Sequence, residues 1–273
     1  AYRVKDAIAD FFNERYGKRP SVRLNNADVQ FNLHINNTTC TLSLDSSGES
    51  LHKRGYRTLS VAAPLKETLA AAILDNTFYN PERDSEKPLA DPFCGSGTFP
   101  IEAALKAWNI APGLNRSFDF EKWAFVPKDC LKKARQEAKD NEHRNRSVQI
   151  FGSDINPKNV EIAKTHARQA GVEDAIRFSV ADARNFRSSQ PYGILVCNPP
   201  YGERLSDQKE VQALMRSFGE AYRALPDWNA YVLTSLPEFE RWFGKNADKK
   251  KKLSNANLVC GLYSYYGKPP KDC

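Results

Sequence analysis

The stretch LADPFCGSGT, at residues 89–98, decides the fold. It begins with apolar residues typical of a buried strand and leads into an apolar pattern typical of a helix. The glycines at positions 95 and 97 let the backbone approach a ligand closely, and a helix N-terminus favours a carboxylate or phosphate group. The stretch therefore predicts a strand, a ligand-binding turn and a helix in succession.

Two common nucleotide-binding motifs do not explain this turn. A dinucleotide fingerprint fits poorly, because Phe99-Pro100 stands where its third glycine would lie. A phosphate-binding Walker loop is excluded, because no Gly-Lys-Ser or Gly-Lys-Thr follows. Taken alone, the two glycines fit an ordinary connecting turn equally well, so the prediction of a ligand site depends on the residues around them.

Strands alternate with helices on both sides of this stretch. The strands predicted from apolar patterning are 89–94, 148–154, 176–180, 194–197, 230–234 and 258–266, and the predicted helices are 65–76, 98–109, 128–144, 157–171 and 211–225. Such alternation is typical of a parallel sheet with helices on both faces. We therefore expect an α/β domain with a doubly wound, mostly parallel sheet over residues 61–273.

The first 60 residues follow a different pattern. Residues 1–16 predict a helix with an apolar stripe, and residues 29–35 and 39–44 predict a β-hairpin. These elements form a small α+β segment that would bury little core by itself. Because the sequence opens without Met inside an amphipathic pattern, we expect a piece of a longer polypeptide.

Acidic residues end three successive predicted strands. They are Asp91, Asp154 and Asp182. Each one alone is more simply explained as a helix cap or turn residue. Together they line one edge of a parallel sheet, where such folds bind ligands, and an acid in this place can hold ribose hydroxyls.

The run NPPY at residues 198–201 carries the most specific chemistry in the chain. It follows the apolar run 192–197 and therefore leaves the C-terminal end of a buried strand. The Asn198 side-chain carbonyl and the Pro199 backbone carbonyl offer two acceptors to the hydrogens of one exocyclic amine. The Tyr201 ring can stack on the base that carries that amine. These acceptors would localise the nitrogen lone pair for attack.

The composition limits the kind of partner. A net charge of +7 favours an anionic partner such as nucleic acid. The six cysteines are scattered, without C-x-x-C pairs or clustered histidines, so neither a metal site nor disulfides are expected. No apolar run approaches the roughly 20 residues of a membrane span. These features predict a cytoplasmic protein, and the KKKK run at 249–252 is more simply a solvated strand edge than an RNA contact.

The motifs together resemble a known family. Residues 91–98 with 198–201 look like the S-adenosylmethionine-dependent amino-methyltransferases of Rossmann-like class I. The strings KRGYR at 53–57, PLKETLA at 64–70 and NPPYGER at 198–204 are similar to THUMP-containing guanine-N2 methyltransferases of large-subunit (23S) ribosomal RNA, which are often labelled adenine-specific DNA methylases. The resemblance covers nearly the whole chain, although residues 1–60 look like only the C-terminal part of a THUMP domain.

This resemblance implies roles for particular residues. The cofactor would be S-adenosylmethionine, with S-adenosylhomocysteine as product, bound by Asp91, Phe93, Gly95, Gly97, Thr98, Asp154 and Asp182. Catalysis would fall to Asn198, Pro199 and Tyr201. Ribosomal RNA would contact Lys53, Arg54, Arg57 and Arg204. A monomer without metal or membrane attachment is expected.

Three alternatives remain open. The same amine site would serve adenine-N6 methylation of DNA, because both bases carry an exocyclic amine, or guanine-N2 methylation of tRNA. A nucleic-acid-binding module without catalysis is less compatible with the intact Asp91, Gly95, Gly97, Asp154 and Asn198. The aromatic-rich segment 110–126 predicts either a packed loop or a cover over the cofactor or RNA site.

Overall fold

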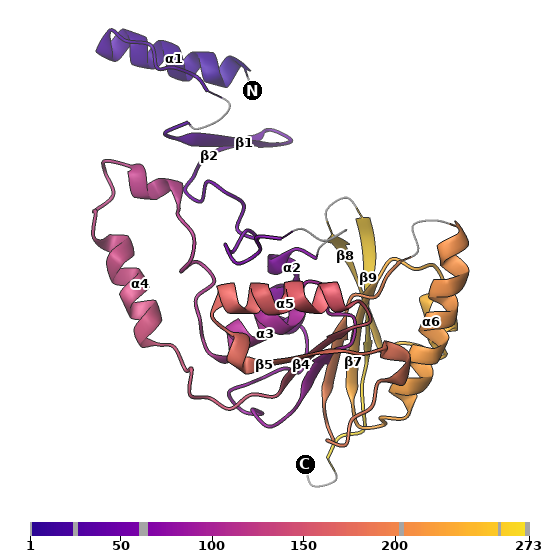
Figure 1. Cartoon of the computed structure of the whole chain (residues 1–273). Coiled ribbons are helices and arrows are strands. Elements are labelled where there is room, and N and C mark those ends of the chain that lie inside the picture. The colour runs from indigo at the N-terminus through magenta and orange to yellow at the C-terminus, as the bar shows by residue number, and fades with distance from the viewer. Residues whose placement is uncertain (1, 24–26, 60–64, 202–204, 256–257, 271–273) are drawn as a thin grey trace. The chain divides into compact units, whose positions relative to one another are not determined.

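The computed structural model describes residues 2–23, 27–59, 65–201, 205–255 and 258–270 (Figure 1). Two compact units are present. The first comprises Ala1–Leu51 with Ser117–Arg135, and the second comprises His52–Arg116 with Gln136–Cys273. Part of the aromatic-rich segment therefore packs with the N-terminal residues.

The first unit contains the predicted helix and hairpin. Helix α1 spans Tyr2–Tyr16, and the antiparallel strands β1 and β2 span Gln30–Asn36 and Thr39–Asp45. The 3-10 helix η1, Asp119–Lys122, lies in the same unit. Asn37 turns the hairpin with a positive φ of 52°, a conformation that asparagine tolerates better than most residues.

The second unit is built on a seven-stranded sheet in the order β5-β4-β3-β6-β7-β9-β8. The first five strands in that order run parallel, β9 is antiparallel to β7, and β8 is antiparallel to β9. The bounds of the strands are Leu89–Asp91 for β3, Ile150–Asp154 for β4, Ile176–Val180 for β5, Ile194–Cys197 for β6, Asn229–Thr234 for β7, Lys249–Asn255 for β8 and Leu258–Tyr265 for β9.

Helices cover both faces of this sheet. Figure 1 shows α2, α3 and α5 on one side and α6 on the other. The bounds are Glu67–Asp75 for α2, Thr98–Ala107 for α3, Cys130–Asp140 for α4, Pro157–Ala170 for α5, Leu205–Arg223 for α6 and Phe239–Phe243 for α7, with 3-10 helices η2 at Glu173–Ala175 and η3 at Ala183–Asn185. The predicted doubly wound, mostly parallel α/β fold is confirmed.

The alternation of strand side chains builds two cores. Leu89 and Ile194 point to the α2–α3 side and join one cluster of buried residues. Ala90 and Leu195, one position later, point to the other face and join a second cluster with Phe218 of α6. Strands buried on both faces explain why the sequence shows continuous apolar runs.

Several elements differ from their predicted bounds. Strand β3 ends at Asp91 rather than residue 94, and α4 is shorter than the predicted helix 128–144. The lysine run forms the first half of the edge strand β8, in agreement with its interpretation as a solvated strand edge. The short helix α7 was not predicted, because its five residues are too few to show helical periodicity.

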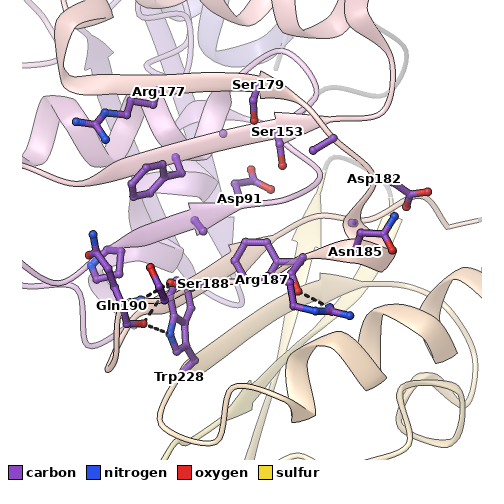
Figure 2. A pocket seen from close by; sticks show the side chains of 18 residues that line it. Asp91, Ser153, Arg177, Ser179, Asp182, Asn185, Arg187, Ser188, Gln190 and Trp228 are labelled. Carbon is purple, nitrogen blue, oxygen red and sulfur yellow. Dashed lines mark hydrogen bonds between the residues drawn. The ribbon is translucent and has the colours of Figure 1, made fainter.

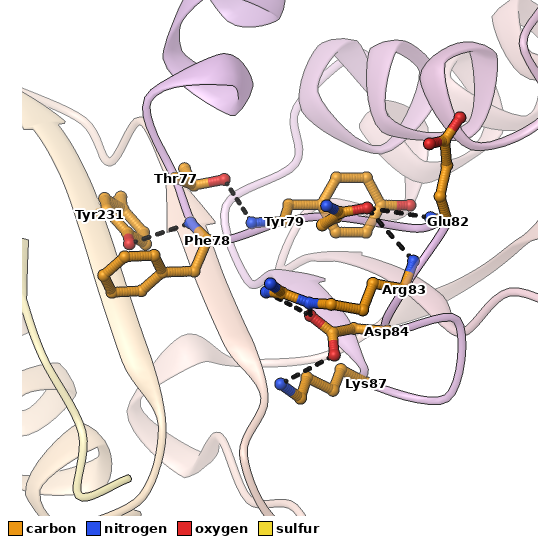
Figure 3. Close-up of polar contacts among 9 residues, drawn as sticks. Thr77, Phe78, Tyr79, Glu82, Arg83, Asp84, Lys87 and Tyr231 are labelled. Carbon is orange, nitrogen blue, oxygen red and sulfur yellow. Dashed lines mark hydrogen bonds and ion pairs between the residues drawn. The ribbon is translucent and has the colours of Figure 1, made fainter. Parts of the chain in front are cut away.

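A polar turn holds the entry to β3 at the amino end of the sheet. The Phe78 N–H donates to the Tyr231 hydroxyl of β7 at 3.2 Å (Figure 3). Asn80 Oδ1 accepts from two backbone N–H groups that follow it, and the Asp84 carboxylate forms an ion pair with Lys87 at 3.1 Å. These contacts fix the connection between α2 and the strand that leads into the glycine turn.

One crossover lacks an α-helix. Residues 181–193, all described, join β5 to β6 with only the three-residue η3. A parallel crossover usually carries a helix that covers the sheet. One face of β4 and β5 is consequently left open beside this connection.

Candidate active site

The glycine loop, residues 94–97, connects β3 to α3. Gly95 and Gly97 have positive φ angles of 51° and 86°, which glycine adopts without strain. A Cβ at Gly97 would lie 3.0 Å from Ala163 Cβ, so this glycine also permits close packing of α3 on α5. A Cβ at Gly95 would meet nothing within 4 Å. Space is therefore open on the Gly95 side of the loop.

Asp91 is the last residue of β3 and is only 2% exposed. Its Oδ1 accepts from the Phe93 N–H at 3.0 Å. Burial raises the pKa of its carboxyl well above the usual value; the Phe93 N–H opposes this rise, and the nearby Asp154 adds to it. A buried acid at the mouth of the glycine loop is a candidate ligand-binding group.

Asp154, at the end of β4, fastens the glycine loop to the neighbouring strand. Its Oδ2 accepts from the Gly95 N–H at 3.1 Å, while Oδ1 accepts from the Asn156 N–H and the Asn159 side chain. Each carboxylate oxygen has two lone pairs, so Oδ2 retains capacity for one further donor such as a hydroxyl.

Asp182 follows β5 and caps η3. Its carboxylate accepts from the Arg184 N–H at 2.9 Å and from the Arg184 guanidinium, with Nε at 2.8 Å from Oδ2. The side-chain hydrogen bond from Arg184 lowers the pKa of the Asp182 carboxyl, and the bond from the Arg184 N–H lowers it further. Its oxygens are largely engaged by this local pair.

Two residues predicted at the cofactor site have other neighbours. The half-buried Phe93 ring packs edge-on against Phe218 of α6, with ring centroids 5.0 Å apart. The Thr98 hydroxyl accepts from Arg57 Nη2 at 2.7 Å, and Thr98 is 5% exposed. Both side chains are thus turned toward the protein interior.

The predicted amine site lies at the point where the strand order reverses. Strands β3 and β6 are parallel neighbours, so residue 198 follows the strand next to the glycine loop. The Tyr201 hydroxyl donates to Asn198 Oδ1, and Cys260 Sγ lies 4.0 Å from the same hydroxyl. Burial raises the pKa of Tyr201 above its usual value. Pro199 is buried and Asn198 is half-buried.

The residues predicted to contact RNA occupy different surroundings. Arg54 forms an ion pair with Glu102 at 3.4 Å, and Arg57 forms one with Glu67 at 3.4 Å; both arginine side chains are less than one-fifth exposed. Lys53 is exposed. Arg204 lies outside the described residues.

A cavity of about 530 Å³ extends from this edge along the open face of β4 and β5 (Figure 2). Phe151 pairs with Arg177, and Ser153 pairs with Ser179, so these four side chains form one wall. Asp91, Asp182 and Trp228 also line it. Its size falls within the roughly 300–1,000 Å³ of small-molecule sites.

These features fit a cofactor that carries an amine, a ribose and a base. Gly95 has open space, and Asp154 has acceptor capacity. The cavity reaches Asp91 and Asp182, although Gly95 and Asp154 do not line it. Ile155, which the sequence did not single out, is 64% exposed directly after Asp154 and offers apolar surface to a flat ring. Its signal was an apolar residue between a strand-ending acid and the helix cap Asn156.

The described part of the chain holds neither a cluster of metal ligands nor a helix that could span a membrane. Among those residues, no three His, Cys, Asp or Glu side chains gather as metal ligands would. No helix within the described ranges combines the length and apolar character of a membrane span.

Family models match both parts of the chain. Residues 54–264 match the model described as "RMKL-like, methyltransferase domain", and residues 1–45 match the THUMP domain. The first match contains the glycine loop, the three strand-ending acids and residues 198–201.

Curated relatives and solved structures point the same way. "Putative RNA methyltransferase YpsC" of Bacillus subtilis is 41% identical over 97% of this chain and 68% of its own length. "Ribosomal RNA large subunit methyltransferase K/L" of Syntrophotalea carbinolica is 41% identical over 97% of this chain, which spans only 38% of that relative.

Two crystal structures are closely similar. SMU.472 complexed with SAH has a TM-score of 0.87 at 39% identity, over 98% of this chain and 70% of the other. A predicted N6-adenine-specific DNA methylase from Listeria monocytogenes has a TM-score of 0.86 at 43% identity, over 97% and 68%.

Proposed function

Because this chain belongs to the family of RMKL-like methyltransferase domains, a class I fold with S-adenosylmethionine as methyl donor, we propose that it methylates the exocyclic N2 amine of a guanine in ribosomal RNA. The observation that carries the proposal is the placement of Asn198 and Pro199 directly after β6, the parallel neighbour of β3, which leads into the glycine loop. Two acceptors there would face one amine beside the methyl donor.

The cofactor would lie across the carboxyl ends of β3, β4 and β5. We assign the methionine end to Asp91, Gly95 and Gly97, and the ribose to the remaining acceptor capacity of Asp154. The adenine would lie against Ile155, with its amino group near Asp182. Arg184 already donates to the Asp182 carboxylate. The adenine amino group would therefore have to share the carboxylate oxygens with Arg184 or displace Arg184 from them.

The donor supplies an electrophilic methyl group when bound. Asn198 Oδ1 and the Pro199 carbonyl would accept the two amine hydrogens and direct the nitrogen lone pair at that carbon. The N–C bond forms as the S–C bond breaks, and the amine proton leaves to water. Positioning supplies most of the catalysis, so a strong general base is not required.

The THUMP match favours RNA over DNA as the substrate. We propose that residues 1–60 act as the C-terminal part of a THUMP-like RNA-binding domain, of which residues 52–59 pack in the second unit, and that residues 61–273 carry the methyltransferase activity in the cytoplasm. Lys53, and Arg204 beyond the described residues, remain proposed RNA contacts. Adenine-N6 methylation of DNA is the second candidate, because the similar Listeria structure carries that name.

The test is methyl transfer from labelled S-adenosylmethionine to separate pools of large-subunit rRNA, tRNA and duplex DNA. Digestion to nucleosides then identifies the methylated product. We expect N2-methylguanosine from rRNA, and about 100-fold less, or lower still, in the same time with Asn198→Ala. N6-methyladenine from DNA would replace the proposal with the second candidate, and cofactor and RNA binding without transfer to any pool would indicate a binding module.

A further inference from the structure

A segment of the second unit, residues 54–59, contacts the start of α3 directly after the glycine loop. Within segment 54–59, Arg57 Nη2 donates to Thr98 Oγ1 at 2.7 Å and to the Leu65 carbonyl at 3.1 Å. Thr98 is the first residue of α3 and directly follows Gly97. One guanidinium therefore ties the end of the glycine loop to the segment.

His166, on α5, makes a second tie between the same two elements. Its ring is fully buried, with Nδ1 3.1 Å from the Ser96 carbonyl oxygen and Nε2 3.3 Å from the Leu59 N–H. A carbonyl only accepts and a backbone N–H only donates, so Nδ1 carries the proton and Nε2 accepts. The geometry fixes one neutral tautomer of His166 between the loop and the segment.

Buried ion pairs hold segment 54–59 in place. Glu102 of α3 accepts from Arg54 at 3.4 Å and from the Tyr56 hydroxyl at 3.1 Å, and Glu67 of α2 pairs with Arg57. Both carboxylate side chains are at most 4% exposed. Removing one partner from such a pair leaves an uncompensated buried charge, so the segment is strongly bound to α2 and α3.

We propose that His166 and Arg57 are positioning residues that hold the glycine loop in its ligand-binding shape and thereby set the affinity for S-adenosylmethionine. The inference rests on the proposed function, because it takes the loop as the cofactor site. The loop contains two residues with positive φ and has open space beside Gly95. Contacts from the interior leave that space free, and a preformed loop needs no ordering when the cofactor binds.

Two substitutions separate the ends of the imidazole. His166→Asn keeps a donor near the place of Nδ1 and so preserves the bond to Ser96. His166→Gln keeps a polar atom near the place of Nε2 and so preserves the bond to Leu59. His166→Leu removes both bonds. If the loop is the functional target, Asn must restore cofactor binding better than Gln.

The experiment is calorimetric titration of the full 273-residue chain with S-adenosylhomocysteine, well below the Tm of every variant. His166→Leu should weaken binding about 10-fold, which corresponds to the loss of the one buried hydrogen bond that reaches the loop, from Nδ1 to the Ser96 carbonyl. His166→Asn should recover most of the affinity and His166→Gln less. Arg57→Met should weaken binding similarly.

The matched control is Arg146→Met, which removes the 2.7 Å bond from Arg146 Nη1 to the Ala107 carbonyl at the opposite end of α3. Its affinity should stay within about twofold of wild type, even if its Tm falls. Equal affinity of wild type and His166→Asn, Gln and Leu, or an equal loss in Arg146→Met, would overturn the positioning role. If His166→Leu does not fold, the order of Asn and Gln decides. A wild-type chain that binds no cofactor would instead overturn the proposed function itself.

Discussion

The Tyr201 hydroxyl donates a hydrogen bond to the amide oxygen of Asn198. This bond holds the amide oxygen of Asn198 in one orientation. A carbonyl oxygen has a second lone pair, so the substrate amine can still donate to it. Tyr201 is therefore joined to the amine site by its hydroxyl as well as by the ring proposed to stack on the base.

Asn198→Ala should reduce single-turnover methyl transfer about 100-fold or more, because it removes an acceptor aimed at the reacting amine. Affinity for S-adenosylhomocysteine should be nearly unchanged, since the cofactor contacts lie on β3, β4 and β5. Rapid-quench assays at saturating cofactor provide the measurement. A near wild-type rate would show that residues 198–201 are not the amine site.

Tyr201→Phe should slow the same step by roughly 3- to 10-fold, about the effect of one hydrogen bond that orients a catalytic group. Tyr201→Ala should lose this bond and also base stacking of about 1–3 kcal/mol. Both variants should also be made in the Asn198→Ala background, where the Tyr201 hydroxyl has no amide oxygen to orient and its contribution to the rate should disappear. If Tyr201→Phe slows transfer by the same factor in the Asn198→Ala background as in the wild type, the hydroxyl acts on a group other than Asn198.

Asp91→Asn should stabilise the protein at neutral pH while weakening cofactor binding. Because burial raises the carboxyl pKa in the folded state above 3.8, the wild type loses stability as the pH rises from 3.8 through the folded pKa. The amide has no such loss. Urea unfolding should show the variant more stable than the wild type at pH 7.5, with a smaller difference at pH 4.5. A difference that shrinks as the pH rises would contradict this assignment.

His166 should make stability fall at mildly acidic pH. Burial lowers the pKa of its folded form below 6.5, while Arg57 and Glu67 exert opposing effects and the Tyr56 ring lies 6.4 Å away. As the pH falls, the unfolded state therefore binds the proton before the folded state does. The contribution of His166 to stability is complete above pH 6.5 and is lost as the pH falls below it. The wild-type advantage over His166→Asn should shrink by up to about 1 kcal/mol between pH 7.5 and 5.5 in urea titrations. A constant advantage would mean that His166 does not titrate in this range.

Lys53 and Arg54 should contribute differently, Lys53 to RNA binding and Arg54 to stability. Lys53→Gln should weaken rRNA binding and reduce the slope of log affinity against log salt by about 1, as for a lost phosphate contact. Arg54→Gln should mainly lower unfolding free energy, by roughly 1–3 kcal/mol, because Glu102 loses a buried partner. Filter binding at several salt concentrations provides the measurement. Salt-independent affinity would refute electrostatic capture at this segment.

The sequence by itself determined the elements and the family. Strands β5 and β6 have the predicted bounds of residues 176–180 and 194–197. The continuous apolar run of β6 records burial on both faces, whereas β5 alternates apolar and polar residues, as a strand with one open face does. Helix α5 begins at Pro157, the first residue of the predicted helix, because proline favours the first helical position. The resemblance carried by residues 91–98 and 198–204 is confirmed by the family match over residues 54–264.

The tertiary structure decided how these residues are partnered. The KRGYR motif predicted basic RNA contacts, yet Arg54 and Arg57 meet Glu102 and Glu67, which helix periodicity alone does not identify as partners. His166 carried no signal in the sequence, because its contact with Ser96 spans 70 positions. Local patterns encode backbone geometry and burial, whereas the pairing of buried charges depends on which helices the folded sheet brings together.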